Sequence, residues 1–240
     1  MNTVELIPIF SDNYVFLITN TESLDAIVID PGEATEVLKV LSDRKLKLHA
    51  ILTTHHHLDH IGGVAELKAA THCEVWAPLK NSNQISADHY VTQNEQLDLK
   101  GFSIQVVELP GHTLGHIAYY FTAQKWLFSG DVLFGLGCGR LFEGDYSTAF
   151  ESLQKVKSFP DETKIFCAHE YTERNLQFCK AQNFPLNPEL IAYEKELVAK
   201  RKLNLPSVPL VLRQEKFCNP FLLASTKGEF AKLRESRNGF

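Results

Sequence analysis

Four potential metal ligands, His55, His57, Asp59 and His60, lie within six residues of this chain, and His56 between them is expected to point away. Four side chains this close in sequence cannot all reach one ion without strain, but two neighbouring ions can share them. His55 and His57 would project together from an extended turn, and Asp59 and His60 would face an adjacent position. We therefore expect the segment to supply ligands to two metal ions.

Three other apolar segments also end in a potential ligand: VVELPGH in His112, WLFSGD in Asp131 and IFCAH in His169. In α/β folds the carboxyl ends of strands line the active-site crevice, so these ends can converge. An isolated HxH pair is more often an ordinary surface or core pair, whereas the complete block with three further ligands favours a metal site. The seven side chains suffice for two ions if one aspartate bridges. Nitrogen and oxygen ligands without cysteine suit Zn²⁺ first, with Fe²⁺ or Mn²⁺ as alternatives.

The elements that must position these ligands alternate between strands and helices, which predicts an α/β fold. Strands are expected where β-rich apolar runs are bounded by turn residues, at 14–19, 26–30, 48–54, 73–78, 102–110, 117–122, 125–130 and 164–168. Helices are expected where apolar residues recur at helical spacing, at 34–44, 62–71, 148–159, 172–182, 187–204 and 229–236. The first two strands should form a hairpin, and the histidine block occupies a strand-to-helix turn. Because strand signals fade beyond residue 174, we predict a body over 1–174 and a helical appendage over 175–240.

The composition argues against several classes of function and location. The net charge of −5 gives no general attraction for nucleic acid or for an anionic membrane, so we expect neither as a partner. No apolar run is long enough to span a bilayer, and the N-terminus does not resemble a secretory signal. Five scattered cysteines without a CxxC pair suit reduced thiols in the cytoplasm. The sequence contains no signal for oligomeric state, and we expect a monomer.

The block His55-x-His57-x-Asp59-His60 resembles the HxHxDH motif of the metallo-β-lactamase superfamily. The resemblance implies an αββα sandwich, in which two mixed sheets pack face to face with helices outside. It also implies the ligand assignment. The first metal would be held by His55, His57 and His112, the second by Asp59, His60 and His169, with Asp131 bridging both.

Two cations that share a water lower its pKa from 15.7 toward neutrality, which generates hydroxide near pH 7. They also stabilise the oxyanion that forms when hydroxide attacks a carbonyl. The expected catalytic residues are Asp59 and Asp131, which are both ligands. A thiolate is a fair leaving group, so a thioester substrate would not require a dedicated strong acid.

Two further segments resemble one branch of the superfamily, the glyoxalase II (hydroxyacylglutathione hydrolase) family. They are Gly137-Cys138-Gly139-Arg140-Leu141-Phe142-Glu143-Gly144 and Ala168-His169-Glu170-Tyr171-Thr172, and Asn219-Pro220-Phe221-Leu222 matches a late segment of the family. The resemblance spans nearly the whole chain. It implies a thioesterase of methylglyoxal detoxification that hydrolyses S-D-lactoylglutathione to glutathione and D-lactate. The residues do not distinguish a lactoyl group from glycolyl or acetoacetyl.

The resemblance places the glutathione part of the substrate against Arg140 and Tyr171, and the helical appendage over 175–240 is predicted to be a substrate-binding region. A surface salt bridge for Arg140 and a core position for Tyr171 are the ordinary alternatives. One position departs from the family, because Leu223 stands where an arginine is expected after the NPF segment. Lys227 is the expected substitute, with Arg234 and Arg237 as alternatives.

Other branches of the same fold are the nearest rival hypotheses. A lactonase or a β-lactamase would use similar ligands, whereas a persulfide dioxygenase uses one iron and would not need the complete second set. A tRNA-processing nuclease would need a basic face or arm that this acidic chain lacks. A scaffolding relative with a dead site would have lost ligands, and none is missing here.

Overall fold

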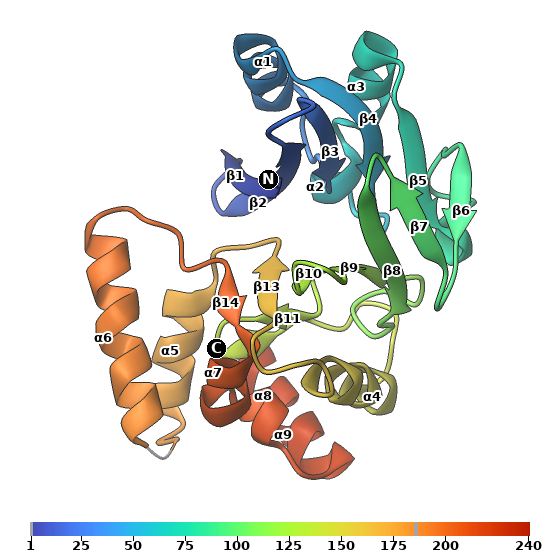
Figure 1. The fold of residues 1–240 in the computed structure, drawn as a ribbon. Coiled ribbons are helices and arrows are strands. Elements are labelled where there is room, and N and C mark those ends of the chain that lie inside the picture. Colours follow the sequence, from blue (N-terminus) through green and yellow to red (C-terminus); the bar gives the residue numbers. More distant parts are fainter. Residues whose placement is uncertain (1, 185–186) are drawn as a thin grey trace. The chain divides into compact units, whose positions relative to one another are not determined.

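In a computed structural model that describes residues 2–184 and 187–240, the chain divides into two units (Figure 1). One unit holds the residues up to Glu108 together with Gly115–Ala123, and the other holds Leu109–Leu114 and Gln124–Phe240. The division follows contacts within the fold rather than a single break in the chain. The boundary predicted between residues 174 and 175 therefore stays a prediction.

The first unit is built on a mixed sheet whose strands follow one another in chain order. The strands are β1 (Asn2–Ile9), β2 (Asn13–Asn20), β3 (Asp25–Ile29), β4 (Lys47–Leu52), β5 (Glu74–Pro78) and β6 (His89–Val91). The first three strands run antiparallel, and β3 to β6 run parallel. The predicted hairpin is thus confirmed, with Phe16 opposite Ile29 in β2 and β3.

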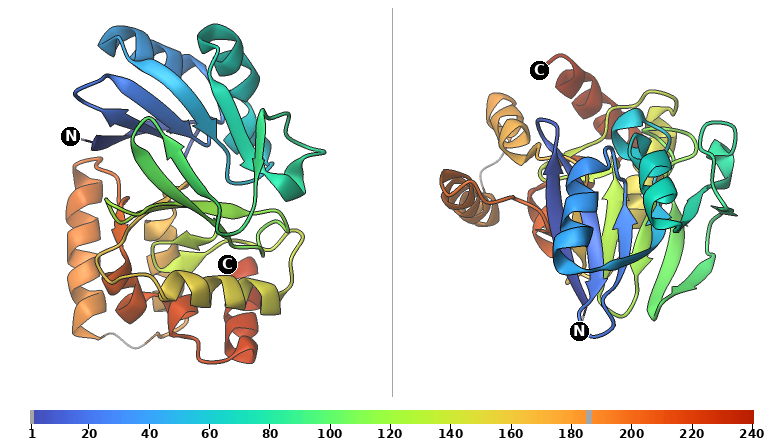
Figure 2. Two further views of the ribbon diagram at one scale, coloured as in Figure 1. Left: turned by 45° about the vertical axis from the view of Figure 1, so that its right-hand side comes forward. Right: turned by 90° about the horizontal axis from the view of Figure 1, so that it is seen from above.

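Two helices, α1 (Thr35–Arg44) and α3 (Val64–Thr71), pack on one face of this sheet (Figure 2). Val37 and Leu41 of α1 and Leu67 of α3 share a buried apolar cluster with side chains of β1 to β5. Strand β3, which pairs in parallel with β4, is buried along nearly its whole length, which is typical of parallel strands in α/β proteins and explains its continuous apolar run.

Strands β7 (Gln96–Leu99), β8 (Phe102–Glu108) and β9 (Ile117–Phe121) form an antiparallel meander in the same unit. The two-residue turn between β7 and β8 consists of Lys100 and Gly101, both with positive φ. This geometry matches the right-handed twist of a hairpin. Two short elements complete the unit, namely α2 (Leu58–Ile61) and the 3₁₀ turn η1 (Leu79–Asn81).

The second unit contains β10 (Trp126–Gly130) and β13 (Lys164–Cys167), which pair in parallel, and β14 (Leu210–Val211), which joins β13 antiparallel. A small hairpin of β11 (Leu133–Phe134) and β12 (Gly137–Cys138) follows β10. Six helices accompany these strands: α4 (Tyr146–Lys157), α5 (Thr172–Ala181), α6 (Pro188–Lys202), α7 (Leu212–Cys218), α8 (Pro220–Leu223) and α9 (Lys227–Asn238). The starts of α4, α6 and α9 are capped by the side chains of Asp145, Asn187 and Thr226.

A buried carboxylate ties the helices of this unit to the β11–β12 hairpin. Glu215 of α7 accepts hydrogen bonds from the Tyr193 hydroxyl (2.7 Å), the Leu136 backbone N–H (2.9 Å) and the Asn219 amide (2.9 Å). The same Asn219 amide donates to the carbonyls of Phe134 and Gly137, each at 3.0 Å. Asn219, the first residue of the NPF segment, therefore fixes the hairpin from inside the unit.

The mixed sheets with their helices confirm the predicted α/β class, and each predicted strand and helix has a counterpart in the structure within a few residues. The elements that were not predicted are the strands β1, β6, β7, β11, β12 and β14, the helices α2, α7 and α8, and the turn η1. Among the residues that the structure describes, no helix is long and apolar enough to cross a bilayer.

Candidate metal ligands

In the first unit the histidine block begins where strand β4 ends, beside the end of the parallel strand β3. The backbone N–H of Asp30 donates to the Leu52 carbonyl at 3.0 Å, which sets Asp30 next to Thr54. Asp30 has a left-handed φ of 51° and is only 2% exposed. A buried carboxylate in a strained backbone conformation is most often found at a functional site.

The Asp30 carboxylate organises the block through three hydrogen bonds. It accepts from the Thr54 backbone N–H (2.7 Å), from Thr54 Oγ1 (2.7 Å) and from His60 Nδ1 (3.0 Å). Since Thr54 Oγ1 donates to Asp30, it accepts from His55 Nδ1, which lies 3.0 Å away. Both histidines therefore carry their proton on Nδ1, which makes Nε2 the nitrogen that can bind a metal. The sequence analysis missed Asp30.

The ligand atoms of the block form two close pairs. His55 Nε2 lies 3.1 Å from His57 Nδ1, and His60 Nε2 lies 3.7 Å from Asp59 Oδ2. Two ligands bound to one tetrahedral Zn²⁺ at about 2.0–2.1 Å would be about 3.3 Å apart, so both spacings are near that of ligands to a shared ion. Asn13 of β2 donates to Asp59 Oδ2 at 2.9 Å and orients it.

The short helix α2, which carries Asp59 and His60, lies directly against the turn after Asp30. A side chain at Gly62 would place its Cβ 2.4 Å from the Gly32 carbonyl oxygen, and one at Gly32 would place it 2.1 Å from the Asp59 carbonyl oxygen. Only glycines permit this approach. The close contact explains the Gly62-Gly63 pair that follows the ligand block.

In the second unit Asp131 and His169 follow the carboxyl ends of the adjacent parallel strands β10 and β13. The Ala168 N–H donates to the Gly130 carbonyl at 3.2 Å, which brings the two ends together. His112 lies on the loop Leu109–Leu114 of the same unit. All three side chains are at least nine-tenths buried.

Each oxygen of Asp131 faces a different histidine. Oδ2 lies 3.3 Å from His112 Nε2, and Oδ1 lies 3.4 Å from His169 Nε2. Both distances equal the spacing of two ligands on one tetrahedral ion. A carboxylate that meets one histidine with each oxygen has the geometry of a bridging ligand, so the donor set of this unit fits two ions.

The loop that carries His112 is bonded to the segment Arg140–Gly144. His112 Nδ1 donates to the Arg140 carbonyl at 2.7 Å, so its proton lies on Nδ1 and its Nε2 faces Asp131. The Phe142 and Gly144 N–H groups donate to the carbonyls of His112 and Gly111, each at 3.1 Å. The two segments that resemble family signatures, PGH and GCGRLFEG, are thus one hydrogen-bonded structure.

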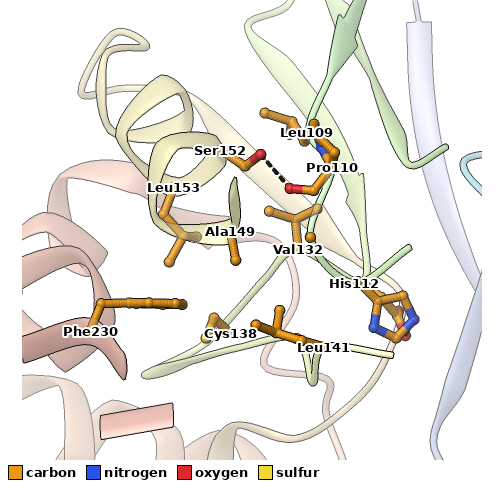
Figure 3. Close-up of a pocket in the computed structure, with 13 residues that line it drawn as sticks. Leu109, Pro110, His112, Val132, Cys138, Leu141, Ala149, Ser152, Leu153 and Phe230 are labelled. Carbon is orange, nitrogen blue, oxygen red and sulfur yellow. Dashed lines mark hydrogen bonds and ion pairs between the residues drawn. The ribbon is translucent and has the colours of Figure 1, made fainter. Parts of the chain in front are cut away.

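Behind this structure lies a cavity of about 10 Å³, lined mainly by apolar side chains (Figure 3). Ala149 and Leu153 of α4 and Phe230 of α9 form one part of its wall, and His112 and Asp131 lie at another. The space is too small for a substrate and has room for about one water. It is therefore a packing feature beneath the ligands.

The predicted substrate contacts have different surroundings. Arg140 is exposed, and its guanidinium carbon lies 5.4 Å from the centre of the Phe142 ring. The Tyr171 ring stacks on His169 at 4.7 Å between centroids with 8° between planes. Lys227 is exposed and is hydrogen-bonded to Ser147 (2.5 Å) and to Glu151 (2.6 Å).

Arg234 and Arg237, the two alternatives to Lys227, both donate hydrogen bonds inside the second unit. The Arg234 guanidinium donates to the backbone of Cys138, and that of Arg237 donates to Asn175 Oδ1 at 3.2 Å. Burial, followed by the neighbouring Arg234 and Arg174 charges, lowers the pKa of Arg237. Leu223 is 39% exposed at the end of α8.

Two family models match the chain side by side. Residues 10–169 match the metallo-beta-lactamase superfamily, and residues 170–240 match the C-terminus of hydroxyacylglutathione hydrolase. The hydroxyacylglutathione hydrolase of Bdellovibrio bacteriovorus is 53% identical over 98% of this chain and 97% of its own length. This chain belongs to the hydroxyacylglutathione hydrolase family.

Solved structures agree on the fold. The crystal structure of ETHE1 from Myxococcus xanthus superposes with a TM-score of 0.75 and 24% identity, covering 98% of this chain and 91% of that one. A di-iron-bound form of TTHA1623 gives a TM-score of 0.59 and 29% identity over 70% of this chain and 91% of that one. Membership of the hydroxyacylglutathione hydrolase family confirms the predicted metallo-β-lactamase αββα fold with its helical appendage. It also confirms the prediction of a metal-dependent hydrolase.

Proposed function

We propose that this chain hydrolyses S-D-lactoylglutathione to glutathione and D-lactate, and that a dinuclear metal centre enables the reaction. The observation that carries the proposal is the geometry of Asp131, whose two oxygens each meet one buried histidine at 3.3–3.4 Å. A carboxylate placed in this way can give one oxygen to each of two ions. The family's hydroxyacylglutathione hydrolases supply the substrate class.

In the proposed centre the two ligand sets combine. One ion would be bound by His55, His57 and His112, the other by Asp59, His60 and His169, and Asp131 would bridge them. Zn²⁺ is the first choice for this nitrogen and oxygen set, with Fe²⁺ or Mn²⁺ as alternatives. The di-iron-bound form of the structural relative TTHA1623 supports iron as an alternative metal.

When bound, two such ions supply Lewis acidity and a water of lowered pKa. The contribution of the protein is to orient the histidine nitrogens that would bind these ions. Asp30 fixes the protons of His60 directly and of His55 through Thr54, and the Arg140 carbonyl fixes that of His112. Such outer partners keep ligand histidines in the correct tautomer and orientation. Asp59 and Asp131, as the carboxylate ligands, also offset the positive charge of the ions.

The glutathione part of the substrate carries carboxylates, which need placed cations because the chain has a net charge of −5. Arg140 suits this role, since its exposed guanidinium can form a forked pair with a carboxylate. Tyr171 offers a hydroxyl close to His169 in sequence and in space. Lys227 donates to Ser147 and Glu151, and its ammonium group has a third proton with which it can contribute to substrate binding. Residues 175–240 would act as the substrate-binding region beside a catalytic body over 1–174.

We further infer a monomeric cytoplasmic enzyme that binds neither nucleic acid nor membranes. The five cysteines are all buried thiols in the structure, as expected in a reducing compartment. The negative net charge favours neither of the excluded partners.

The test is a steady-state assay of metal-reconstituted protein with S-D-lactoylglutathione, beside the glycolyl and acetoacetyl thioesters, a chromogenic β-lactam and an acyl-homoserine lactone. We expect kcat/KM above about 10⁴ M⁻¹s⁻¹ for a glutathione thioester and negligible turnover of the lactam and the lactone. Metal analysis of the same sample should give two ions per chain. A preference for the lactone, or saturation at one ion, would contradict the proposal.

A further inference from the structure

Glu170 lies between a candidate metal ligand, His169, and a candidate substrate contact, Tyr171, in the short connection from β13 to α5. The rings of its two neighbours stack at 4.7 Å between centroids with 8° between planes. The Phe134 ring of β11 contacts both, at 5.9 Å from the His169 ring and 5.1 Å from the Tyr171 ring. The two rings therefore form one packed group, and a displacement of the backbone at Glu170 would move both.

The Glu170 carboxylate is bound by both polar groups of Ser207. Its Oε2 accepts from the Ser207 backbone N–H at 2.8 Å, and its Oε1 accepts from Ser207 Oγ at 2.6 Å. Since Ser207 Oγ donates its single proton to Glu170, it accepts from Thr172 Oγ1, which lies 2.7 Å away. The Glu170 side chain is only 8% exposed, and Ser207 and Thr172 are buried. A buried carboxylate that is hydrogen-bonded at both oxygens is fixed in position.

The pairing of two strands brings Ser207 to this place. Strands β13 and β14 lie side by side and run antiparallel, with Ile165 opposite Leu210 (Figure 1). When this register is continued by three residues along each chain, Ser207 lies beside the residue that precedes His169. The contact with Glu170 therefore follows from the course of the chain as it enters β14.

Arg201 at the end of helix α6 adds a positive charge beside the same carboxylate. Its Nη1 lies 3.7 Å from Glu170 Oε2 and donates to the Leu205 carbonyl at 3.0 Å. Its Nε donates to Glu173 Oε2 at 3.1 Å. The Arg201 side chain is partly exposed, so solvent weakens both ion pairs, and the buried hydrogen bonds of Ser207 dominate the position of Glu170.

We propose that Glu170 is a positioning residue that fixes the orientation of His169 and Tyr171 together. By joining the backbone between them to Ser207, it keeps His169 Nε2 at 3.4 Å from Asp131 Oδ1 and the Tyr171 ring against His169. The appendage that carries Ser207 thereby orients a metal ligand. The inference rests on the proposed function in taking His169 as a metal ligand and Tyr171 as a substrate contact.

Two changes at Glu170 separate its hydrogen bonds from its charge. Glu170→Met keeps the length of the side chain and removes both acceptors. In Glu170→Gln the amide oxygen can accept from the Ser207 N–H, while the amide NH₂ donates to Ser207 Oγ, which then donates to Thr172. The hydrogen bonds stay complete in the reversed direction, so the glutamine variant should rescue the position of the backbone.

Glu173→Met is the matched control. Glu173 lies three residues further along the chain and pairs with the same Arg201, but its side chain is 53% exposed. Its described hydrogen bond goes to Arg201 and not to Ser207. Its loss should therefore leave the connection between His169 and Tyr171 in place.

The experiment compares the three variants with the wild type at a temperature where each is folded. Zn²⁺ affinity is measured by competition with a chelator, and the geometry of the site by the visible absorption of bound Co²⁺. We expect Glu170→Met to weaken Zn²⁺ binding by about 10-fold and to alter the Co²⁺ bands, as for the loss of a group that orients a ligand. Glu170→Gln and Glu173→Met should both stay near the wild-type affinity and spectrum.

Kinetics with S-D-lactoylglutathione at saturating metal test the position of Tyr171. We expect KM to rise about 2–10-fold in Glu170→Met, the effect of one lost hydrogen bond to substrate. Because the two rings stack, the Co²⁺ spectrum and KM should change together, and a change in only one of them would contradict the joint role. Wild-type affinity and KM in Glu170→Met would overturn the proposal, and so would an equal loss in Glu170→Gln or Glu173→Met.

Two further outcomes are covered by the same measurements. If Glu170→Met does not fold, Ser207→Ala decides, because it removes the hydroxyl bond to Glu170 and leaves the backbone bond. Wild-type affinity, spectrum and KM in that variant would then overturn the proposal. If the wild type fails to hydrolyse the thioester, the proposed function fails, whereas the affinity and spectral comparison still tests the role of Glu170 toward His169.

Discussion

Replacing Asp30 by asparagine tests whether one buried carboxylate sets the protons of two ligand histidines. The change keeps the size and shape of the side chain and removes one acceptor oxygen. If the remaining oxygen faces Thr54 Oγ1 and His60 Nδ1, the new amide group faces the Thr54 backbone N–H, donor against donor. If the amide is flipped, its NH₂ group faces Thr54 Oγ1 and His60 Nδ1, which are both donors.

The magnitude follows from the more favourable orientation. One hydrogen bond to a charged group is lost, and two buried donors face each other, which costs about 2–3 kcal/mol of unfolding free energy. In a chain of this size that loss lowers the melting temperature by roughly 4–12 °C. His60 and His55 are less firmly oriented, so we expect metal affinity to fall by about 10–100-fold.

The assay is chelator competition for Zn²⁺, paired with thermal unfolding of the metal-free protein. Asp25→Asn is the control, because Asp25 begins the strand β3 that Asp30 follows and also pairs with a histidine, His49, but outside the ligand block. Metal affinity in Asp30→Asn within twofold of the wild type would refute the reasoning. So would an equal loss in Asp25→Asn.

Three other changes have defined outcomes. Asp131→Ala removes the proposed bridge, so metal analysis should show fewer than two ions and activity should fall below about 10%, whereas retained activity would exclude the bridging role. Leu223→Arg should lower KM for glutathione thioesters by up to roughly fivefold, the effect of one exposed ion pair, with kcat unchanged; an unchanged KM would mean that another cation already serves. Burial raises the pKa of the Glu215 carboxyl group above its ordinary value of 4.5, so the folded state binds the carboxyl proton more tightly than the unfolded chain does. The unfolding free energy should therefore fall as the pH rises from about 4.5 through the raised pKa. Glu215→Gln should flatten that part of the stability profile in thermal melts from pH 4.5 to 8, and a slope equal to the wild type's would contradict the sign.

The candidate ligand residues could be predicted from sequence because each lies within a few residues of the end of an apolar strand or in the turn that follows one. Asp131 after WLFSG and His169 after KIFCA need only the rule that adjacent parallel strands end at the same edge, and the structure pairs β10 with β13 in that way. Strand β1 was missed because it is an edge strand that contains Pro8 and alternates weakly in burial. Proline is tolerated there since an edge strand has one unpaired side.

The supporting residues could not be named, because nothing local marks them. Asp30 precedes Pro31-Gly32 and has the sequence signature of a turn, and only the pairing of β3 with β4 brings it to Thr54. Arg234 was predicted only as an alternative to Lys227 for substrate binding, and no sequence pattern indicated that it is buried. Its burial depends on the packing of α9 against α4 and α8, which is a tertiary property.

The contact between Arg234 and Gly139 spans 95 positions of the chain, and this separation sets an order of events during synthesis. At about 5–20 residues per second, roughly 5–20 s pass between the appearance of Gly139 and that of Arg234 on the ribosome. During that interval the carbonyls of Cys138 and Gly139 lack the hydrogen bonds that Arg234 donates in the folded protein. The second unit can therefore complete its packing around these two residues only after helix α9 has been synthesised.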